Sequence, residues 1–158
     1  MVSLEPRNTP ALPIVRAFSP RFGIRPDQTL FARFEKSPGS NSTVGWILIN
    51  SVISGANACY LVHTVGKELY LLNGTGPNLQ PGSITFNGSI ASPLGNSQCT
   101  VISGTVATSG NEIVVTVNVS FASSFNGNKF VYKGMTDSTG SNTGWQLVGV
   151  MYFSGSAF

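Results

Sequence analysis

The side chains with the most reactive chemistry lie close together in residues 54–63, SGANACYLVH. This segment holds Cys59, one of two cysteines, and His63, the only histidine of the chain. A thiol beside an imidazole can form a nucleophilic pair, and both groups are also ligands of zinc. Either chemistry requires the two side chains to meet in space.

The spacing argues against a Cys59–His63 pair. The apolar alternation of the segment predicts a β-strand, on which positions i and i+4 share a face but lie about 13 Å apart. That separation prevents a hydrogen bond between the two side chains. A zinc site is also incomplete, because Cys59, His63 and Cys99 fall short of the usual four ligands. The sequence therefore predicts no catalytic residue, no metal site and no cofactor.

Cys59 and Cys99 can instead be partners of each other. Both lie within apolar runs, and two cysteines in a chain with the composition of an extracellular domain favour a disulfide. Closing the loop between them would stabilise the fold by roughly 3–4 kcal/mol if the geometry is unstrained. Two buried free thiols, as in a cytoplasmic protein, and two metal ligands remain the alternatives.

The composition is that of a β-protein with a packed core. The chain has 158 residues, enough for one domain, with 41% hydrophobic and only 9% charged residues. No long segment carries apolar residues with a helical period. Five arginines in the first 33 residues are spread through Pro-rich sequence and not concentrated on one element, so we expect no nucleic-acid binding. No run of 18 apolar residues occurs, so the sequence predicts no membrane span.

Runs with a two-residue apolar period, separated by Gly, Pro, Asn and Ser, predict nine or ten short strands. The clearest run points its large apolar residues to one face: Ile113, Val115, Val117, Val119 and Phe121. The predicted strands are 13–18, 28–35, 44–50, 57–63, 68–73, 83–90, 97–104, 111–121, 128–135 and 144–153. The predicted fold is an all-β, antiparallel, immunoglobulin-like sandwich of about nine strands over residues 13–158, after an extension or linker at residues 1–12.

Several segments together resemble a known module. They are Ala56–Leu61, Leu69–Asn73, Asn96–Val101, Phe125–Lys133 and Asp137–Gln146. The resemblance covers most of residues 15–153 and is to a module that occurs, often in tandem, in large surface or secreted proteins of soil bacteria. That module is treated as an immunoglobulin- or fibronectin-III-like domain. The resemblance implies a bacterial, extracellular or cell-surface location, but no reaction and no ligand.

This chain departs from the module at two places. Gly74 follows Asn73 where the module carries an aspartate, which weakens any expectation of calcium at that loop. The N-terminal arginines are not a feature of the module either. The N-terminus also lacks a basic segment followed by an apolar run, so no signal peptide is visible in this sequence.

The amphipathic aromatic residues support carbohydrate binding as a second hypothesis for the function. Flat rings can stack on sugar faces, and nearby amides and carboxylates can hydrogen-bond to hydroxyl groups. The candidate ligand-binding residues are Trp145, Tyr132, Tyr70, Asp137, Asn142 and Gln146. Trp46 lies inside an apolar run and is expected in the core. The loop 137–144 offers many oxygen atoms but one carboxylate, so a network of turn hydrogen bonds is favoured there over calcium.

The six acidic residues keep a hydrolase as a third hypothesis for the function, although their spacing along the chain does not bring any two of them together. The leading expectation is a non-catalytic, structural or adhesive module, with polysaccharide or neighbouring modules as partners. Low charge on the outward strand faces also leaves sheet edges poorly protected against pairing. We therefore expect homo-oligomers through sheet edges, with 145–153 as the strand that pairs.

Overall fold

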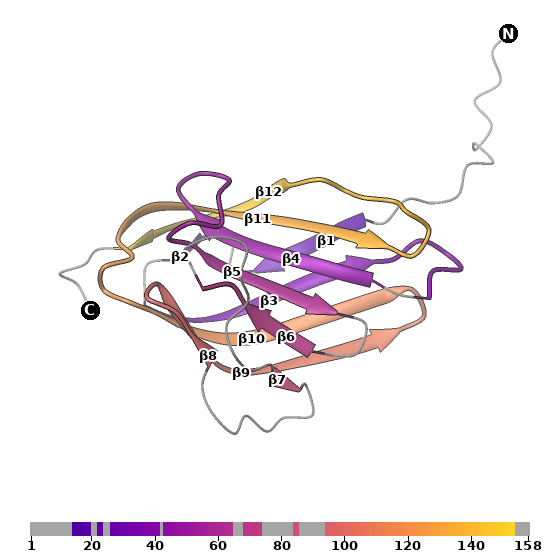
Figure 1. The fold of residues 1–158 in the computed structure, drawn as a ribbon, viewed down its shortest axis with the longest axis horizontal. Helices are drawn as coiled ribbons and strands as arrows, with labels where there is room; N and C mark the ends of the chain where they lie inside the picture. Colours follow the sequence, from indigo (N-terminus) through magenta and orange to yellow (C-terminus); the bar gives the residue numbers. More distant parts are fainter. Residues whose placement is uncertain are drawn as a thin grey trace, which may run out of the picture.

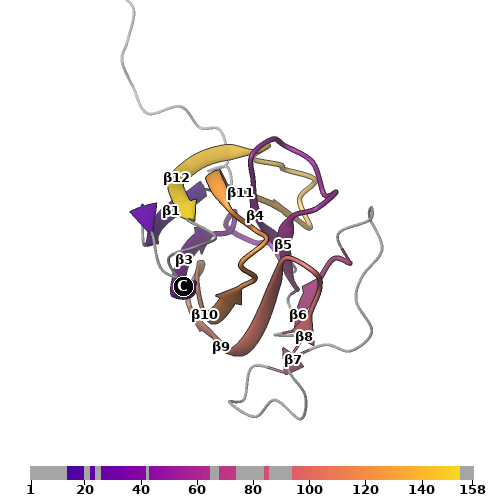
Figure 2. The ribbon, with the colours of Figure 1, turned by 90° about the vertical axis from the view of Figure 1, so that its left-hand side faces the viewer.

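The computed structural model describes residues 14–19, 22–23, 26–41, 43–64, 68–73, 84–85 and 94–153. Within these ranges the chain forms strands and turns but no helix, and the strands form two sheets (Figure 1). Figure 2, turned by 90°, shows β12 and β4 on one side of the sandwich and β9 and β10 on the other. The predicted all-β sandwich is confirmed. The predicted extension at residues 1–12 lies outside the described residues.

One sheet has five strands, and each of its neighbouring pairs is antiparallel. In spatial order they are β1 (Ile14–Ser19), β3 (Asp27–Glu35), β10 (Glu112–Phe121), β9 (Cys99–Ser109) and β8 (Leu94–Gly95). The long hairpin of β9 and β10 forms its centre, with a register shift between Asn118 and Val119.

The other sheet has seven strands, and only β2, which runs parallel to β12, breaks the antiparallel pattern. In spatial order they are β2 (Phe22–Gly23), β12 (Gln146–Phe153), β11 (Gly127–Asp137), β4 (Thr43–Asn50), β5 (Cys59–Thr64), β6 (Glu68–Leu71) and β7 (Ile84–Thr85). The predicted hairpin of 57–63 and 68–73 is present as β5 and β6. Of the predicted strand 83–90, only Ile84–Thr85 is described as strand.

In the described part of the chain, nine strands have four or more residues, and β2, β7 and β8 have two each. This agrees with the predicted number of about nine. The strand order is compatible with an immunoglobulin-like module. In the variable type of that fold, one sheet has the order ABED, and the other extends its GFC core by strands C′ and C″. Here β1-β3-β10-β9 and β12-β11-β4-β5-β6 stand in those places.

The core lies between the inner faces of the two sheets. In β10 every second residue from Ile113 to Phe121 is buried, as its apolar alternation predicts. These side chains meet Leu30, Ala32 and Phe34 of the same sheet and the inner residues of the opposite one. At one end of the core, the rings of Phe121, Phe125 and Phe153 form a cluster with centroids 4.7–5.8 Å apart.

A disulfide joins the two sheets. It links Cys59 at the start of β5 to Cys99 at the start of β9, with the two Cα atoms 5.7 Å apart. The predicted pairing is confirmed, and the alternatives of free thiols and metal ligands are excluded for these two residues. Antibody domains carry their disulfide between strands B and F. The corresponding strands here are β3 and β11, so this cross-link lies elsewhere in the sandwich.

The Asn96 side chain holds the backbone around the disulfide. Its Nδ2 donates to the carbonyls of Ala58 and Leu72, at 3.0 and 2.8 Å. Its Oδ1 accepts from the backbone N–H groups of Gln98 and Cys99, at 2.7 and 2.9 Å. The amide thus uses both ends to connect the segments before Cys59 and Cys99. This explains why an asparagine three residues before Cys99 is useful to the fold.

Reduction of the disulfide is expected to lower the free energy of unfolding by roughly 3–4 kcal/mol, because the open chain regains the entropy of a long loop. Urea denaturation with and without reductant measures this difference. The variant C59A/C99A is the control and should be insensitive to reductant. Two reactive thiols in denatured protein that had never met a reductant would contradict the cross-link.

Candidate functional site

Several aromatic rings lie on the outer face of the seven-stranded sheet. In β4 the odd-numbered residues, such as Ile47 and Ile49, face the core, so the even-numbered ones face away from it. Trp46 is therefore an outer-face residue and is only partly buried. The expectation that Trp46 lies in the core is wrong. The run GWILIN is apolar on both faces, so its pattern does not reveal which face is inside.

The backbone just before Trp145 crosses over Gly134 of β11 and places Trp145 on this outer face. A Cβ atom on Gly134 would lie 2.7 Å from the carbonyl oxygen of Gly144 and 3.0 Å from Cε3 of Trp46. Only glycine at this position lets the backbone before Trp145 approach the sheet so closely. The indole of Trp145 is thereby brought beside rings that extend from β4 and β5.

Three rings and one amide surround a groove of about 330 Å³. Its lining consists of Trp46, Tyr60, Asn142, Gly144 and Trp145. The ring centroid of Trp145 is 6.0 Å from that of Trp46 and 5.6 Å from that of Tyr60, and both pairs are steeply inclined. Packing among the rings fixes their orientations before any ligand arrives. Burial raises the pKa of the Tyr60 hydroxyl, so this group is neutral at physiological pH.

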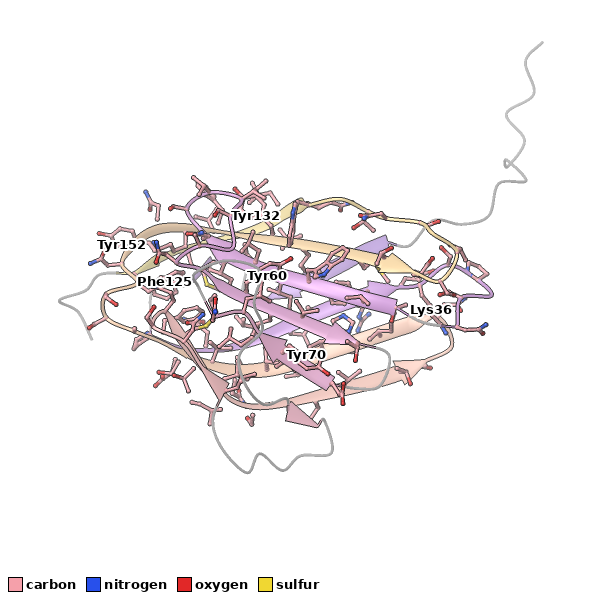
Figure 3. The ribbon with its side chains drawn as sticks, viewed as in Figure 1. Lys36, Tyr60, Tyr70, Phe125, Tyr132 and Tyr152 are labelled. Atoms are coloured by element: carbon pink, nitrogen blue, oxygen red, sulfur yellow. A yellow bond between two sulfur atoms is a disulfide. The ribbon has the colours of Figure 1, made fainter. Side chains whose placement is uncertain are left out.

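The predicted aromatic residues share this face but not the groove. Tyr132 of β11 is labelled in Figure 3. It pairs with Leu48 and Leu147, one row of the sheet away from Trp46. Tyr70 of β6 lies beyond Val62, and its hydroxyl donates to Glu68 Oε2. Of the three predicted rings, Trp145 alone lines the groove.

The predicted polar residues divide between the groove and the loop beneath it. Asn142 lines the groove, and its Oδ1 accepts a hydrogen bond of 2.7 Å from the N–H of Gly144. This bond leaves the Nδ2 donors of Asn142 available. Gln146 begins β12 next to Trp145, pairs with Lys133 and is exposed.

Asp137 is used by the fold. Its carboxylate accepts hydrogen bonds from the N–H of Ser37, at 3.0 Å, and from the N–H and hydroxyl of Thr139. Burial alone would raise the pKa of Asp137, but these hydrogen bonds from Thr139 and Ser37 outweigh it and lower the pKa to about 2. The carboxylate joins the loop after β3 to the loop after β11, which is the turn network that the sequence favours over calcium.

Sequence reasoning missed Trp46 and Tyr60 as members of the groove. A signal for Tyr60 exists, because Cys59 and Leu61 must face the core and the residue between them must then face outward. For Trp46 the needed information is the cross-strand register, which pairs Trp46 with Val62 and Gly134. The register depends on the whole sheet and not on the local segment.

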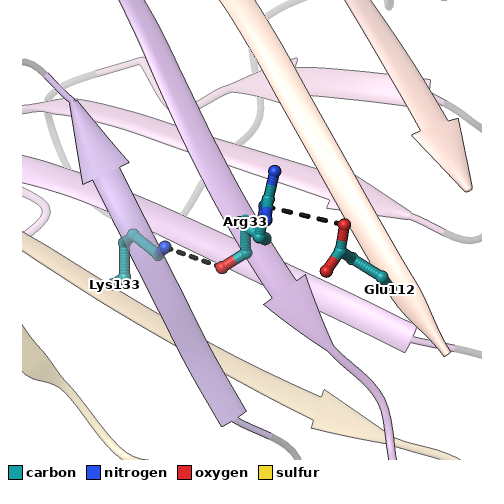
Figure 4. A network of polar contacts seen from close by, with 3 residues as sticks. All are labelled: Arg33, Glu112 and Lys133. Carbon is teal, nitrogen blue, oxygen red and sulfur yellow. Dashed lines mark hydrogen bonds and ion pairs between the residues drawn. The ribbon is translucent and has the colours of Figure 1, made fainter.

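Two basic side chains are buried in the core behind this sheet. Lys133 of β11 is 0% exposed, donates from Nζ to the carbonyl of Arg33 at 2.9 Å, and lies over the Phe34 ring (Figure 4). His63 of β5 is 2% exposed, and its ring centroid lies 4.8 Å from that of Phe34. Burial lowers the pKa of Lys133 to about 7. Burial, followed by the charge of Lys133, lowers the pKa of His63 to about 4.

The acidic residues of the described chain are not gathered into a catalytic pair at the groove. Glu112 forms an ion pair with Arg33 at 3.6 Å on the other sheet (Figure 4), and Glu68 accepts from Tyr70. Among the residues that the structure describes, none that lines the groove carries a carboxylate. The described residues also contain no group of three or more His, Cys, Asp or Glu side chains arranged to hold a metal ion.

The buried Lys133 is expected to make stability rise with pH above neutrality. Between about pH 7 and pH 10 an unfolded lysine is protonated while Lys133 is largely neutral, so the unfolded state binds more protons. The free energy of unfolding should then increase by up to about 1.4 kcal/mol per pH unit. Urea denaturation of wild type and Lys133→Met at pH 7.5 to 9.5 measures the difference in slope. Equal slopes would show that Lys133 keeps its proton in the folded protein.

The ring of His63 leaves no room for a side chain at Gly45, its cross-strand partner in β4, so we expect glycine to be required there. A Cβ atom at position 45 would lie 2.0 Å from His63 Nε2. Gly45→Ala should therefore destabilise the fold by about 1–3 kcal/mol, as other overpacked cores do. A double-mutant cycle with His63→Ala tests the contact, since removal of the ring should recover much of the loss. Strictly additive effects of the two substitutions would contradict it.

Comparison of the chain with protein-family models and with curated proteins found no match. In the described part of the chain there is no helix that could span a membrane. The assignment of a function therefore depends on the geometry of the groove and of the sheet face around it.

Proposed function

We propose that the chain is a non-catalytic, immunoglobulin-like binding module of a surface or secreted protein, and that it binds polysaccharide in the groove of Trp46, Tyr60 and Trp145. The observation that carries this proposal is the gathering of these rings with Asn142 around one groove, on a sheet face that none of the described strands covers.

The chemistry of the groove suits a sugar. One face of a pyranose ring presents C–H groups that pack well on an aromatic ring, while its hydroxyl groups need hydrogen-bond partners at the edges. Trp46 and Trp145 supply apolar surface and indole N–H donors, and Tyr60 supplies a hydroxyl. Asn142 adds amide donors. Since the rings are already packed against one another, binding costs little side-chain entropy.

The charge of the groove favours a neutral polysaccharide. The described residues of its lining include no Lys, Arg, Asp or Glu, so a uronate or an amino sugar would lose hydration without gaining an ion pair from them. The same absence of carboxylates in the lining gives less support to the hydrolase reading, since glycoside hydrolysis generally uses two acidic groups flanking the bond.

The location and the module type are supported less directly. The order of the strands is compatible with a variable-type immunoglobulin-like sandwich. The disulfide is consistent with an extracellular location, because such cross-links persist in oxidising compartments. Both observations agree with the resemblance to modules of bacterial surface proteins.

A second candidate, adhesion to a protein partner, is favoured by an apolar patch at one end of the same face. In β12, Leu147 is 59% and Tyr152 52% exposed, with Val150 between them. Val52 and Ile53 are also exposed and follow Asn50, which shares Phe130 as a strand partner with Val150. Exposed apolar side chains that gather in this way mark interaction surfaces in many proteins.

Binding to immobilised neutral polysaccharides is the test, with cellulose, xylan and mannan as ligands. Trp145→Ala and Tyr60→Ala should each weaken retention by at least about tenfold, because aromatic anchors in binding sites are worth 1–3 kcal/mol or more. Tyr152→Ala is the matched control, an exposed aromatic on the same face outside the groove, and should bind like wild type.

Loss of retention in Tyr152→Ala with full retention in Trp145→Ala would reject the groove and favour the apolar patch. No retention of the wild-type protein on any of the three polysaccharides, with a folded protein by circular dichroism, would reject polysaccharide as the ligand.

A further inference from the structure

A second cavity lies at one end of the sandwich, between the two sheets. Its volume is about 210 Å³. The loop after β3, the end of β5 and the turn between β9 and β10 meet there, and Figure 3 shows Lys36 at this end, with Phe125 at the other. The lining residues are Lys36, Thr43, His63, Thr64, Val106, Thr108, Gly110 and Ile113. None of them lines the aromatic groove, so this is a separate site.

One buried polar atom that faces the cavity, Nε2 of His63, has no hydrogen-bond partner among the described residues. Oγ1 of Thr64 has none among them either, but Thr64 follows His63 in β5 and its side chain faces the other side of the sheet. Folded proteins rarely leave a buried polar atom without a partner. His63 is 2% exposed, so its side chain belongs to the buried wall of the cavity and not to the protein surface. The arrangement indicates that a molecule that forms hydrogen bonds belongs there.

The charges around the cavity favour an anion. Lys36 donates from Nζ to the carbonyl of Ser40 at 2.9 Å, and an ammonium group has two further donors. The lining holds no carboxylate among the described residues. The carboxylate of Asp137, across the strand pair from Thr43, is occupied by hydrogen bonds from Ser37 and Thr139.

The apolar part of the lining sets a second requirement. Val106 and Ile113, from the two strands of the central hairpin, form the opposite wall. Since a water molecule occupies roughly 30 Å³ in the liquid, the cavity has room for a molecule of about six or seven heavy atoms. A small anion with a short hydrocarbon chain satisfies the size, the charge and the apolar wall together.

We propose that this cavity is a binding site for a short-chain carboxylate. The carboxylate accepts hydrogen bonds from Lys36 Nζ, and the neutral His63 imidazole donates from Nε2 to the same group. The hydrocarbon chain packs on Val106 and Ile113. The site is independent of the aromatic groove, and either one can exist without the other.

The single histidine gives this proposal a direct probe, because the imidazole of His63 yields one set of NMR signals. Butyrate is the test ligand, and butylamine and 1-butanol are matched ligands with the same chain and a different charge. Butyrate should shift the His63 signals saturably, with a Kd in the millimolar range, as befits six heavy atoms. Butylamine should produce no shift, and butanol should bind at least about fivefold more weakly.

Two lysine variants locate the carboxylate. Lys36→Gln should weaken butyrate binding by at least about fivefold. Lys129→Gln is the control, since Lys129 lies over the Phe125 ring at the opposite end of the sandwich, and it should bind butyrate like wild type.

Three results would overturn the proposal. Unchanged His63 signals up to 100 mM butyrate would mean that the cavity holds water only. An equal response to butylamine would exclude a carboxylate site, and this comparison needs only the wild-type protein. Equal weakening by Lys36→Gln and Lys129→Gln would assign the effect to general charge.

Discussion

The strict alternation of side chains along a β-strand is the constraint on which this structure depends. The two sheets bury one face each, and the Cys59–Cys99 disulfide fixes which residues of β5 and β9 point inward. Once Cys59 and Leu61 are inside, Tyr60 must be outside. Cross-strand pairing extends the same choice through β4 to β11 and gives the seven-stranded sheet its aromatic outer face.

The sequence is sufficient for the fold class, because that depends on local patterns. The alternation in residues 111–121 fixes both the strand and its buried face, and Asn96 with Cys99 marks the start of β9. The two cysteines favour a disulfide, and the structure decides for it against free thiols and metal ligands. The groove is less predictable, since Trp46 lies in a run that is apolar on both faces. Its position depends on Gly134, a residue on another strand that has no side chain to suggest a function.

Asp137 is a second residue whose role cannot be predicted from the local sequence. An acidic residue in a Ser- and Thr-rich loop suggests a ligand or a metal, but its carboxylate is bonded to Ser37, which is distant in sequence. A local pattern cannot reveal that partner. His63 is a similar case: the spacing to Cys59 suggests a reactive pair, whereas the fold directs Cys59 to Cys99 and packs His63 against Phe34. Antibody domains have a disulfide between the strands that correspond to β3 and β11. In this chain, Lys133 of β11 lies over the ring of Phe34 of β3.

The central claim is that the groove of Trp46, Tyr60 and Trp145 is where a neutral polysaccharide binds. The chain has two tryptophans, and both line this groove, so their two indole N–H signals report on it without any substitution. Titration with neutral hexasaccharides of glucose, xylose or mannose, followed by ¹⁵N NMR, is the most direct measurement. The account predicts that at least one sugar shifts both indole signals saturably and with the same Kd. Backbone shifts confined to β12 and the loop after β4, with both indole signals unchanged, would contradict it.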